Sequence, residues 1–529
     1  MESTDDLDVL IIGAGINGLY TLHVLRSAGL QVRAVETGPE VGGTWYWNRY
    51  PGAALDSESY IYASHFSSEV NEEWQWTDEF ADQATMERHL KFVADRLDLR
   101  RSIEFETEVT SCIWQTEART WRVETNKRTY QATFVVAATG ILSVPVLPEY
   151  DGLTDFQGRI LHTAQWPRGG VDLAGESVAV MGVGSTGIQV IQSLAPVVDH
   201  LTVLQRTPNW ATPMNNRPLT SERQQEIRET HAELYRATMA TSKCFLGDMR
   251  SERTMEVSAE DRERYFDHLY QKPGLTFFTE NFQDVFVDKE ANDALCDFLR
   301  RKIEERVKDP ATARRLVPEH HFGMKRPPLE TNYYEVFNQV NVDLVALTDE
   351  PIVRFGPFGV ETERRSIPLD TLVLATGFDA VTGSFLRLGV RGSDGRALSE
   401  WWNDGPRTFM GCTVSGFPNW FIVGGPQGTS GNNPRCAHYV SDWIRDLIIF
   451  MRKMGHQTVD TAEASESDWV DHCNELVMMT LLRDAESWQW GSNVPGKKRA
   501  FLQYLDSQVE YRRKLDTVTE GEYRELIFE

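Results

Sequence analysis

Two continuous apolar runs, each followed by a glycine-rich turn, mark the main pattern of this chain. The first is Asp8–Ile12 and the second is Ser177–Met181. Such runs are typical of strands buried on both faces, as in a parallel sheet covered by helices. After each turn comes a segment with helical spacing and then another apolar strand, at 31–35 and at 200–205. The pattern therefore predicts two β-α-β units and an α/β fold.

The segments around these units have other patterns. Residues 103–137 alternate between apolar and polar positions, which predicts a small β-meander. Residues 211–318 are rich in Arg, Glu, Gln and Lys at helical spacing, which predicts a helical insertion with solvated charged faces. Two further buried strands end in the triplet Ala-Thr-Gly, at 138–140 and at 375–377. A chain of 529 residues is too long to fold around one hydrophobic core of ordinary size, so we expect two or three domains.

Charge and composition exclude several classes of function. The net charge of −24 argues against nucleic acid or an anionic membrane as a partner, and an anionic cofactor would need locally placed Arg and Lys. No apolar run approaches the roughly 18 residues of a membrane helix, and the N-terminus lacks the pattern of a signal peptide. The six cysteines are scattered without C-x-x-C, and the adjacent His320 and His321 are poorly spaced to share a metal. We expect a cytoplasmic protein without a metal site.

Both β-α-β units carry the glycine spacing of a phosphate-binding turn. The glycines are Gly13, Gly15 and Gly18 in the first unit, and Gly182, Gly184 and Gly187 in the second. They allow a tight turn and let a pyrophosphate approach the N-terminus of the following helix. Glu36 ends the next strand of the first unit, where a carboxylate can accept a hydrogen bond from a ribose hydroxyl. We therefore predict two dinucleotide sites.

The two units differ at the position of that acid. The second unit has Gln205, Arg206 and Thr207 there. A carboxylate would repel a 2′-phosphate, whereas a guanidinium attracts it and can bind it with two hydrogen bonds. The second unit is therefore predicted to bind NADP(H). The alternative for Arg206 is a solvated residue at the end of a strand.

Two charged groups outside the glycine turns are candidates for a chemical role. Asp56 follows the apolar residues 53–55, where an unpaired carboxylate would be costly, so we expect a cationic partner for it. The alternative for Asp56 is a turn or cap residue. Lys325 and Arg326 precede two prolines, which fix an extended segment. The alternative for this pair is a solvated basic surface. Residues 42–52, with three consecutive aromatics, are expected to form a loop against a large ring.

Five further motifs follow one another along the chain: G-G-T-W at 42–45, D-x-E-S at 56–59, F-x-G-x-x-x-H-x-x-x-W-P at 156–167, and the pairs Arg206-Thr207 and Lys325-Arg326. Together with the two glycine turns they resemble the motifs of the type I (class B) Baeyer–Villiger monooxygenases, of the cyclohexanone and phenylacetone monooxygenase kind. The resemblance extends from about residue 8 to about residue 515. The ending Trp166-Pro167 favours this family over related flavin monooxygenases, whose pattern typically ends in Tyr. His162 is expected to be a structural hydrogen-bonding residue rather than a proton shuttle.

The resemblance implies an architecture of two Rossmann-like dinucleotide domains with a helical insertion. The FAD-binding domain is expected to be discontinuous and to comprise residues 1–145 and 372–529. The NADP-binding domain is expected at 150–210 and 319–371, and the helical insertion at 211–318.

The same resemblance implies the chemistry. Such enzymes use NADPH and O2 to convert ketones to esters or lactones through a C4a-peroxyflavin and a Criegee-type intermediate. Arg326 is the implied catalytic residue that stabilises the negative charge, because a guanidinium stays charged and presents several donors. Asp56 is expected to pair with it. Trp488 matches a mobile loop over the nicotinamide, and its alternative is a packed surface aromatic.

The implied cofactor contacts come from both units and from the loops beside them. For FAD they are Gly13, Gly15, Gly18, Glu36, Thr44, Trp45, Tyr46, Trp47, Asp56, Tyr62 and Val109; for NADP(H) they are Gly182, Gly184, Ser185, Thr186, Gly187, Gln189, Arg206, Thr207, Lys325, Arg326 and Trp488.

Two other functions remain open from the sequence: a flavin monooxygenase that oxidises N or S atoms, and a flavin-binding redox protein without turnover. A flavin disulfide reductase is disfavoured because C-x-x-C is missing. The expected partners are a small-molecule ketone and O2, with the protein a monomer or weak homo-oligomer. The sequence is compatible with cyclic, aromatic, steroid and linear ketones.

Overall fold

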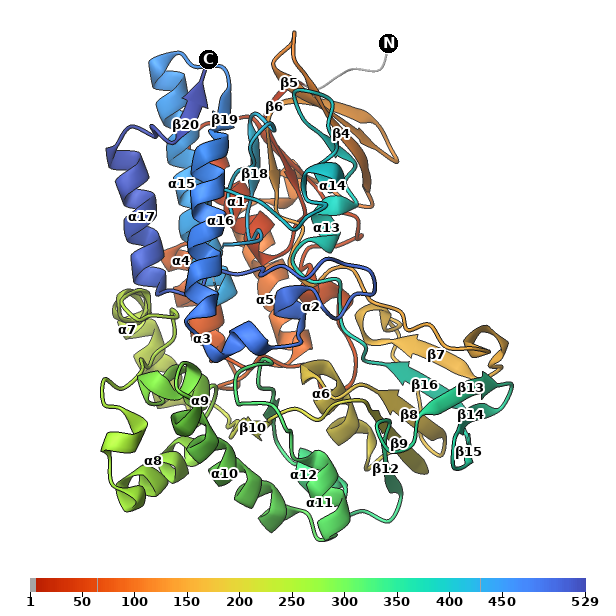
Figure 1. Ribbon diagram of the computed structural model, residues 1–529. Coiled ribbons are helices and arrows are strands. Elements are labelled where there is room, and N and C mark those ends of the chain that lie inside the picture. Colours follow the sequence, from red (N-terminus) through yellow and green to blue (C-terminus); the bar gives the residue numbers. More distant parts are fainter. Residues whose placement is uncertain (1–5, 64, 429) are drawn as a thin grey trace.

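A computed structural model describes residues 6–63, 65–428 and 430–529, and it contains two large sheets stacked along the long axis of the molecule (Figure 1). The upper sheet has eight strands. In spatial order they are β17 (Val390–Arg391), β4 (Val109–Gln115), β5 (Thr120–Thr125), β6 (Thr129–Ala137), β1 (Asp6–Ile12), β2 (Val32–Val35) and β3 (Ile103–Glu104), and β18 (Trp420–Ile422) also pairs with β6. Strands from both ends of the sequence therefore build one sheet.

The lower sheet has five parallel strands. Their order is β12 (Val342–Ala346), β9 (His200–Gln205), β8 (Ser177–Met181), β16 (Thr371–Leu374) and β7 (Arg159–His162). Val178, Ala179 and Val180 of β8 are fully buried, as expected for a central strand covered on both faces. A small antiparallel sheet follows β12, formed by β13 (Ile352–Gly356), β14 (Gly359–Thr362) and β15 (Ser366–Pro368).

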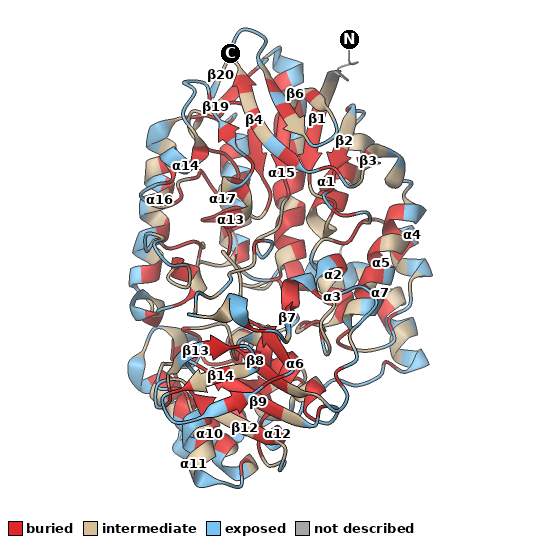
Figure 2. Cartoon of the chain, turned by 90° about the vertical axis from the view of Figure 1, so that its right-hand side faces the viewer, coloured by how far each residue is buried: buried red, intermediate tan, exposed pale blue. Residues whose placement is uncertain are grey.

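Helices cover both sheets, and Figure 2 shows buried residues concentrated in the strands, with exposed ones on the outer helices. The upper sheet is covered by α1 (Ile16–Ser27), α5 (Gln83–Arg96) and α15 (Asn433–Met454), and α1 packs against α15. Helices α16 (Glu463–Met478) and α17 (Gln508–Glu520) and the hairpin of β19 (Val459–Thr461) and β20 (Leu526–Phe528) complete this end. In the lower sheet, α6 (Ser185–Leu194) connects β8 to β9.

The segment 211–318 is helical, as its polar spacing predicted. It contains α7 (Ser221–Met239), α8 (Ala259–Gln271), α9 (Thr276–Thr279), α10 (Lys289–Arg306) and α11 (Pro310–Leu316). Asp288 caps α10 by accepting a hydrogen bond from the backbone N–H of Ala291, as N-cap carboxylates do. Buried residues of α8 and α10 share one core with the lower sheet, whereas Ile227 of α7 packs into the core of the upper sheet. The helical segment therefore connects the two sheets.

Residues 44–47 differ from expectation. They form a one-turn helix, α2 (Thr44–Trp47), where the aromatic run predicted a loop. Gly42 and Gly43 have φ of 131° and 53°, which reverses the chain. The carbonyl of Gly43 then accepts hydrogen bonds from the backbone N–H groups of Tyr46 and Trp47, at 2.9 and 3.0 Å, and closes the turn.

No helix among the described residues is both long enough and apolar enough to span a bilayer. Within the same residues, no group of three or more His, Cys, Asp or Glu side chains is arranged to hold a metal ion.

Candidate active site

The first glycine turn connects β1 to α1 and is closed by the first Ala-Thr-Gly strand. Gly13 has φ of 107°, and a Cβ atom there would lie 2.6 Å from the carbonyl oxygen of Ala138. A Cβ atom on Gly18 would lie 2.0 Å from the carbonyl oxygen of Gly13. Gly15 caps α1 and faces Gly43, and no side chain stands between the two. The turn therefore requires glycine and leaves the N-terminus of α1 open to an anion.

The side chain of Glu36 is hydrogen-bonded to the backbone of this turn. The side chain is 7% exposed, and its two carboxylate oxygens accept hydrogen bonds from the backbone N–H groups of Ala14 and Gly38, each at 2.8 Å. Burial raises the pKa of Glu36, and these two hydrogen bonds oppose the rise. The buried amide oxygen of Asn17, in the first turn of α1, has no hydrogen-bond partner among the described residues. The donors, glycines and open polar group of this turn fit a dinucleotide.

The second glycine turn repeats the first. Gly182 has φ of 105°, and its Cβ atom would lie 2.5 Å from the carbonyl oxygen of Ala375, in the second Ala-Thr-Gly. A Cβ atom on Gly187 would lie 2.0 Å from the carbonyl oxygen of Gly182. A Cβ atom on Gly184 would meet nothing within 4 Å, so space lies in front of Ser185 and Thr186 at the start of α6. This turn also fits a dinucleotide.

Two cations lie near the second turn without a carboxylate. Arg206 and Thr207 are exposed just after β9, and Lys325 is half-buried. Burial lowers the pKa of Lys325, and the charge of Arg206 lowers it further, so the two cations are close enough to repel. Neither forms an ion pair in the part of the chain that the structure describes. A phosphate group would relieve this repulsion.

Asp56 and Arg326 form an ion pair. The Nη1 atom of Arg326 lies 2.6 Å from Oδ2 of Asp56, and both side chains are about one-third exposed, at 34% and 29%. The carbonyl oxygen of Arg326 accepts a hydrogen bond from Nδ2 of Asn209, at 3.0 Å. Asn209 is buried, and its amide oxygen has no partner among the described residues. The pairing of Asp56 with a cation was expected from its apolar context, whereas no sequence pattern indicated Asn209.

Trp45, one of the aromatic residues after the first turn, contacts Tyr62, on which the charges of this pair act. Trp45 and Tyr46 of α2 are buried, Thr44 and Trp47 are exposed, and Val109 is buried in β4. The indole N–H of Trp45 donates a hydrogen bond to the hydroxyl of Tyr62, at 3.2 Å. Burial raises the pKa of Tyr62 to about 12, and the charges of Asp56 and Arg326 act on the same hydroxyl. Tyr62 therefore lies beside the ion pair.

Two predicted site residues make contacts that join parts of the molecule. The amide of Gln189 accepts a hydrogen bond from the hydroxyl of Tyr50, at 2.8 Å, and donates one to the carbonyl of Ala54, at 3.1 Å. It therefore joins α6 to the loop that leads to Asp56. Trp488 is half-buried and packs in a small cluster with Val381 and Leu502.

His162 is engaged within its own sheet. Its Nδ1 atom accepts a hydrogen bond from the backbone N–H of Ala164, at 3.1 Å, and its Nε2 atom lies 3.5 Å from the hydroxyl of Thr376. Burial lowers the pKa of His162. These contacts suit the structural role expected of this residue.

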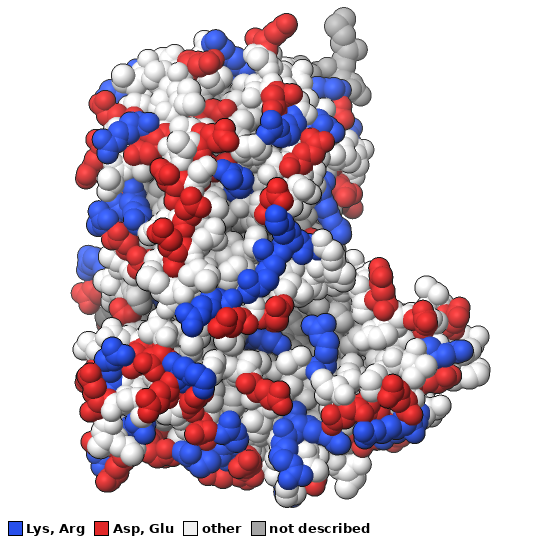
Figure 3. Space-filling view, viewed as in Figure 1, with Lys and Arg blue, Asp and Glu red and all other residues white. Residues whose placement is uncertain are grey.

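The surface charge is uneven around this region. Acidic side chains are spread over the face seen in Figure 3, while Lys and Arg form a band at the level between the two sheets. A chain with net charge −24 thus has a local group of cations at the level between the two sheets.

Comparison with known proteins adds independent findings. Residues 10–274 match the family model described as pyridine nucleotide-disulphide oxidoreductase. The chain is 38% identical to a Baeyer–Villiger monooxygenase of Pseudooceanicola batsensis, over 99% of this chain and 96% of that protein. It is 39% identical to the acetone monooxygenase (methyl acetate-forming) of a Gordonia species, over 96% of this chain and 97% of that protein. The crystal structure of OTEMO in complex with FAD and NADP superposes with a TM-score of 0.96 at 36% identity, with both chains fully covered.

Proposed function

Because the chain belongs to the FAD- and NADPH-dependent Baeyer–Villiger monooxygenases, we propose that Asp56 and Arg326 form the centre at which it converts a ketone to an ester or lactone. The observation that carries the assignment of residues is the ion pair itself, at 2.6 Å. It lies beside Tyr62 and is anchored through Asn209 to the segment that follows β9. Gln189 of α6, the helix that follows the second glycine turn, also donates a hydrogen bond to Ala54 in the loop before Asp56.

The two cofactors are assigned to the two glycine turns. FAD would be held by the turn around Gly13 and Gly15, with its pyrophosphate at the N-terminus of α1 and its ribose near Glu36. NADPH would be held by the turn around Gly182, with its 2′-phosphate between Arg206 and Lys325. Bound FAD, once reduced by NADPH, supplies the activation of O2.

Arg326 would stabilise the negative charge that develops when oxygen adds to the ketone carbonyl. A guanidinium suits this role because it stays charged and presents a rigid fork of donors. Preorganised donors of this kind are worth most where water is excluded. Asp56 would hold the fork in one orientation while part of it still faces the reacting atoms. The overall reaction balances as ketone, O2, NADPH and a proton giving ester, water and NADP⁺.

The expected localisation and assembly are also proposals. All six cysteines are buried and none forms a disulfide, which suits a reducing compartment such as the cytoplasm. A monomer or weak homo-oligomer is proposed, and light scattering coupled to size-exclusion chromatography measures it directly.

The reaction class is tested with a panel of ketones, supplied with NADPH and O2. We expect NADPH consumption to depend on the added ketone and the product mass to increase by one oxygen atom. A thioether and a tertiary amine belong in the same panel. Oxidation of these two without any oxidation of a ketone would contradict the proposal and favour an N- or S-oxygenating enzyme.

The assignment of Arg326 is tested separately with Arg326→Ala and Arg326→Lys. The alanine variant should bind FAD and still accept a hydride from NADPH, but form no ester. The lysine variant keeps the charge but loses the fork, so it should retain a small part of the activity. Ester yield per NADPH is the measurement, and a normal yield from Arg326→Ala would remove Arg326 from the mechanism.

A further inference from the structure

Two segments that lead from one sheet to the other begin directly at the glycine turns. The first, residues 141–150, leaves the upper sheet after the triplet whose Ala138 closes the first turn. The second, residues 376–382, leaves the lower sheet after Ala375, which closes the second turn. We call these two segments together the connecting ladder. Its geometry determines how one turn is placed relative to the other.

The two segments of the connecting ladder run antiparallel and are hydrogen-bonded to each other. The backbone N–H of Val146 donates to the carbonyl of Gly377, at 2.9 Å. In the other direction, the N–H groups of Asp379 and Val381 donate to carbonyls of the first segment, each at 2.8 Å. The ladder is short, so further contacts matter for how firmly it is held.

Lys497, from far along the sequence, reaches this ladder. Its Nζ atom lies 2.5 Å from Oδ1 of Asp379 and 2.6 Å from the hydroxyl oxygen of Thr382. The side chains of Lys497 and Asp379 are 18% and 23% exposed, so their attraction is screened less than that of a surface ion pair. The next residue, Lys498, pairs with Asp404, but those two side chains are 57% and 84% exposed. Adjacent lysines thus form one enclosed and one solvated ion pair, and the enclosed one reaches the ladder.

Two more side chains near Lys497 contact the same part of the ladder. Nδ2 of Asn493 donates a hydrogen bond to the carbonyl of Phe378, at 2.8 Å. Trp488 packs against the apolar cluster that contains Ala380 and Val381. The segment 487–500 is therefore attached to the ladder by an ion pair, a hydrogen bond and an apolar contact.

We propose that Lys497 is a positioning residue, whose ion pair with Asp379 clamps the connecting ladder and holds the two glycine turns in the arrangement needed for hydride transfer. The proposal rests on the assignment of FAD and NADPH to these turns. The transfer converts NADPH to NADP⁺ and supplies the flavin with two electrons. It requires donor and acceptor atoms at a close, defined distance, so a looser ladder lowers its rate. The binding of NADPH at the second turn does not involve the clamp.

Hydrogen exchange of the FAD-loaded enzyme, followed by mass spectrometry, tests the clamp without any reaction. In Lys497→Gln the N–H groups of the ladder should exchange about tenfold faster, as the loss of a charge-assisted hydrogen bond implies. Lys497→Arg keeps the charge and should restore most of the protection. Lys498→Gln is the matched control, because it removes only the solvated ion pair, and it should leave the ladder unchanged.

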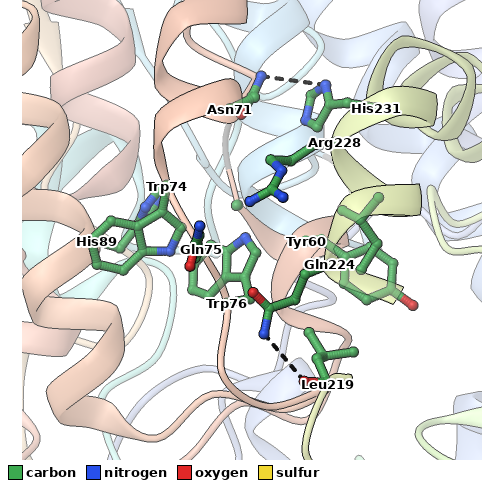
Figure 4. A pocket seen from close by; sticks show the side chains of 12 residues that line it. Tyr60, Asn71, Trp74, Gln75, Trp76, His89, Leu219, Gln224, Arg228 and His231 are labelled. Atoms are coloured by element: carbon green, nitrogen blue, oxygen red, sulfur yellow. Dashed lines mark hydrogen bonds between the residues drawn. The ribbon is translucent and has the colours of Figure 1, made fainter. Parts of the chain in front are cut away.

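Peptides around the small cavity between α5 and α7 (Figure 4) are the internal reference for this exchange experiment. None of the residues that line this cavity belongs to the ladder or to residues 487–500. These peptides should therefore exchange equally in all variants.

The rate of flavin reduction by NADPH, measured without O2, tests the consequence for the reaction. Lys497→Gln should lower this rate about tenfold, since misplacement of reacting groups is costly, while Kd for NADPH stays nearly constant. Asp379→Asn should have the same effect. The double variant should be no slower than either single variant, because all three lack the same ion pair. Flavin absorbance and Tm show that each variant is folded.

The outcomes separate the clamp from the assignment of the cofactors. Wild-type exchange and reduction rates in Lys497→Gln would overturn the proposal, as would equal effects of Lys497→Gln and Lys498→Gln. If the wild type formed ester while Lys497→Gln behaved identically, the clamp alone would be wrong. If NADPH did not reduce the flavin of the wild type, the cofactor assignment would fail, and the positioning role with it.

Discussion

At the scale of single residues, the candidate site depends on an ion pair and on a further hydrogen bond that holds one of its two residues in place. Asp56 pairs with Arg326, and the backbone of Arg326 is held by the amide of Asn209. A cationic partner for Asp56 could be predicted from its apolar context, and the resemblance to the family implied that this partner is Arg326. The contact of Asn209 could not, because a hydrogen bond from a side chain to a backbone carbonyl leaves no complementary residue type in the sequence. Its unpartnered buried oxygen becomes visible only in the fold.

Asn209→Ala should therefore change the chemistry more than the binding of NADPH. Loss of one hydrogen bond costs about 1 kcal/mol and frees the backbone of Arg326, so ester formation should fall roughly fivefold. NADPH consumption without ester should rise, while KM for NADPH changes little. Asn341→Ala is the control, since Asn341 makes the same kind of bonds to the carbonyls of Ala195 and Val198 away from the site. If both variants couple NADPH to ester equally well, Asn209 has no positioning role.

Arg206→Ala tests the assignment of the 2′-phosphate. The guanidinium of Arg206 and the ammonium of Lys325 have no carboxylate partner among the described residues, so the cofactor phosphate would be their counter-ion. A charge-assisted hydrogen bond is worth about 1.5–3 kcal/mol, so KM for NADPH should rise roughly tenfold or more. KM for NADH, which lacks the phosphate, should stay nearly constant. Parallel increases for both cofactors would place the phosphate elsewhere.

At the scale of elements, the hydrophobic periodicity was sufficient to predict the two β-α-β units and the alternating strands of residues 103–137. Each predicted glycine turn is present, and each is closed by the alanine of an Ala-Thr-Gly strand, Ala138 or Ala375. The one-turn helix at Thr44–Trp47 was predicted wrongly as a loop. Its four residues are too few to show a helical period, and its hydrogen bonds depend on the positive φ of Gly42 and Gly43.

The second turn offers two glycine variants with different expected effects. Gly182→Ala places a methyl group 2.5 Å from a backbone carbonyl at a φ of 105°, so it should lower Tm and NADPH affinity together. Gly184→Ala places its methyl group in open space at a φ of −76°, so the fold should stay stable. That space is where the cofactor phosphate is proposed, and KM for NADPH should therefore rise. Unchanged KM in Gly184→Ala would show that the cofactor does not approach this turn.

At the scale of the whole molecule, the two sheets are linked by contacts between segments far apart in sequence. Gln189 of α6 bonds to the loop before Asp56, and a Cβ atom on Gly52 of that loop would lie 2.6 Å from the carbonyl of Gln189. The discontinuous arrangement of the upper sheet was implied by the resemblance to the family. The sharing of cores between the helical segment and both sheets was not, because amphipathic spacing identifies a buried face without identifying what covers it.

The pH dependence of stability should report on the contact between the Asp56 loop and the helical segment. The titrating group is Glu58, which lies two residues after Asp56 and directly before α3 (Ser59–Tyr62). Burial raises the pKa of Glu58 from 4.5 to about 7, and the nearby carboxylates of Glu79 and Glu280 add to the rise. The folded state therefore holds this proton more tightly than the unfolded state. Its contribution is fully present below pH 4.5 and is lost as the pH rises through 7. The loss amounts to about 3 kcal/mol at most.

Glu58→Gln keeps the shape of the side chain and removes its titration. The variant should therefore lose less stability than the wild type between pH 5.5 and pH 8, and at pH 8 its Tm should be the higher of the two. Tm of the FAD-loaded enzyme, followed by flavin fluorescence, measures both values. Glu304→Gln, at an exposed position of α10, is the control and should follow the wild type at both pH values. If the Tm difference between Glu58→Gln and wild type is the same at pH 5.5 and pH 8, the carboxyl of Glu58 does not titrate in this range. The contact between the Asp56 loop and the helical segment would then not depend on the ionisation of Glu58.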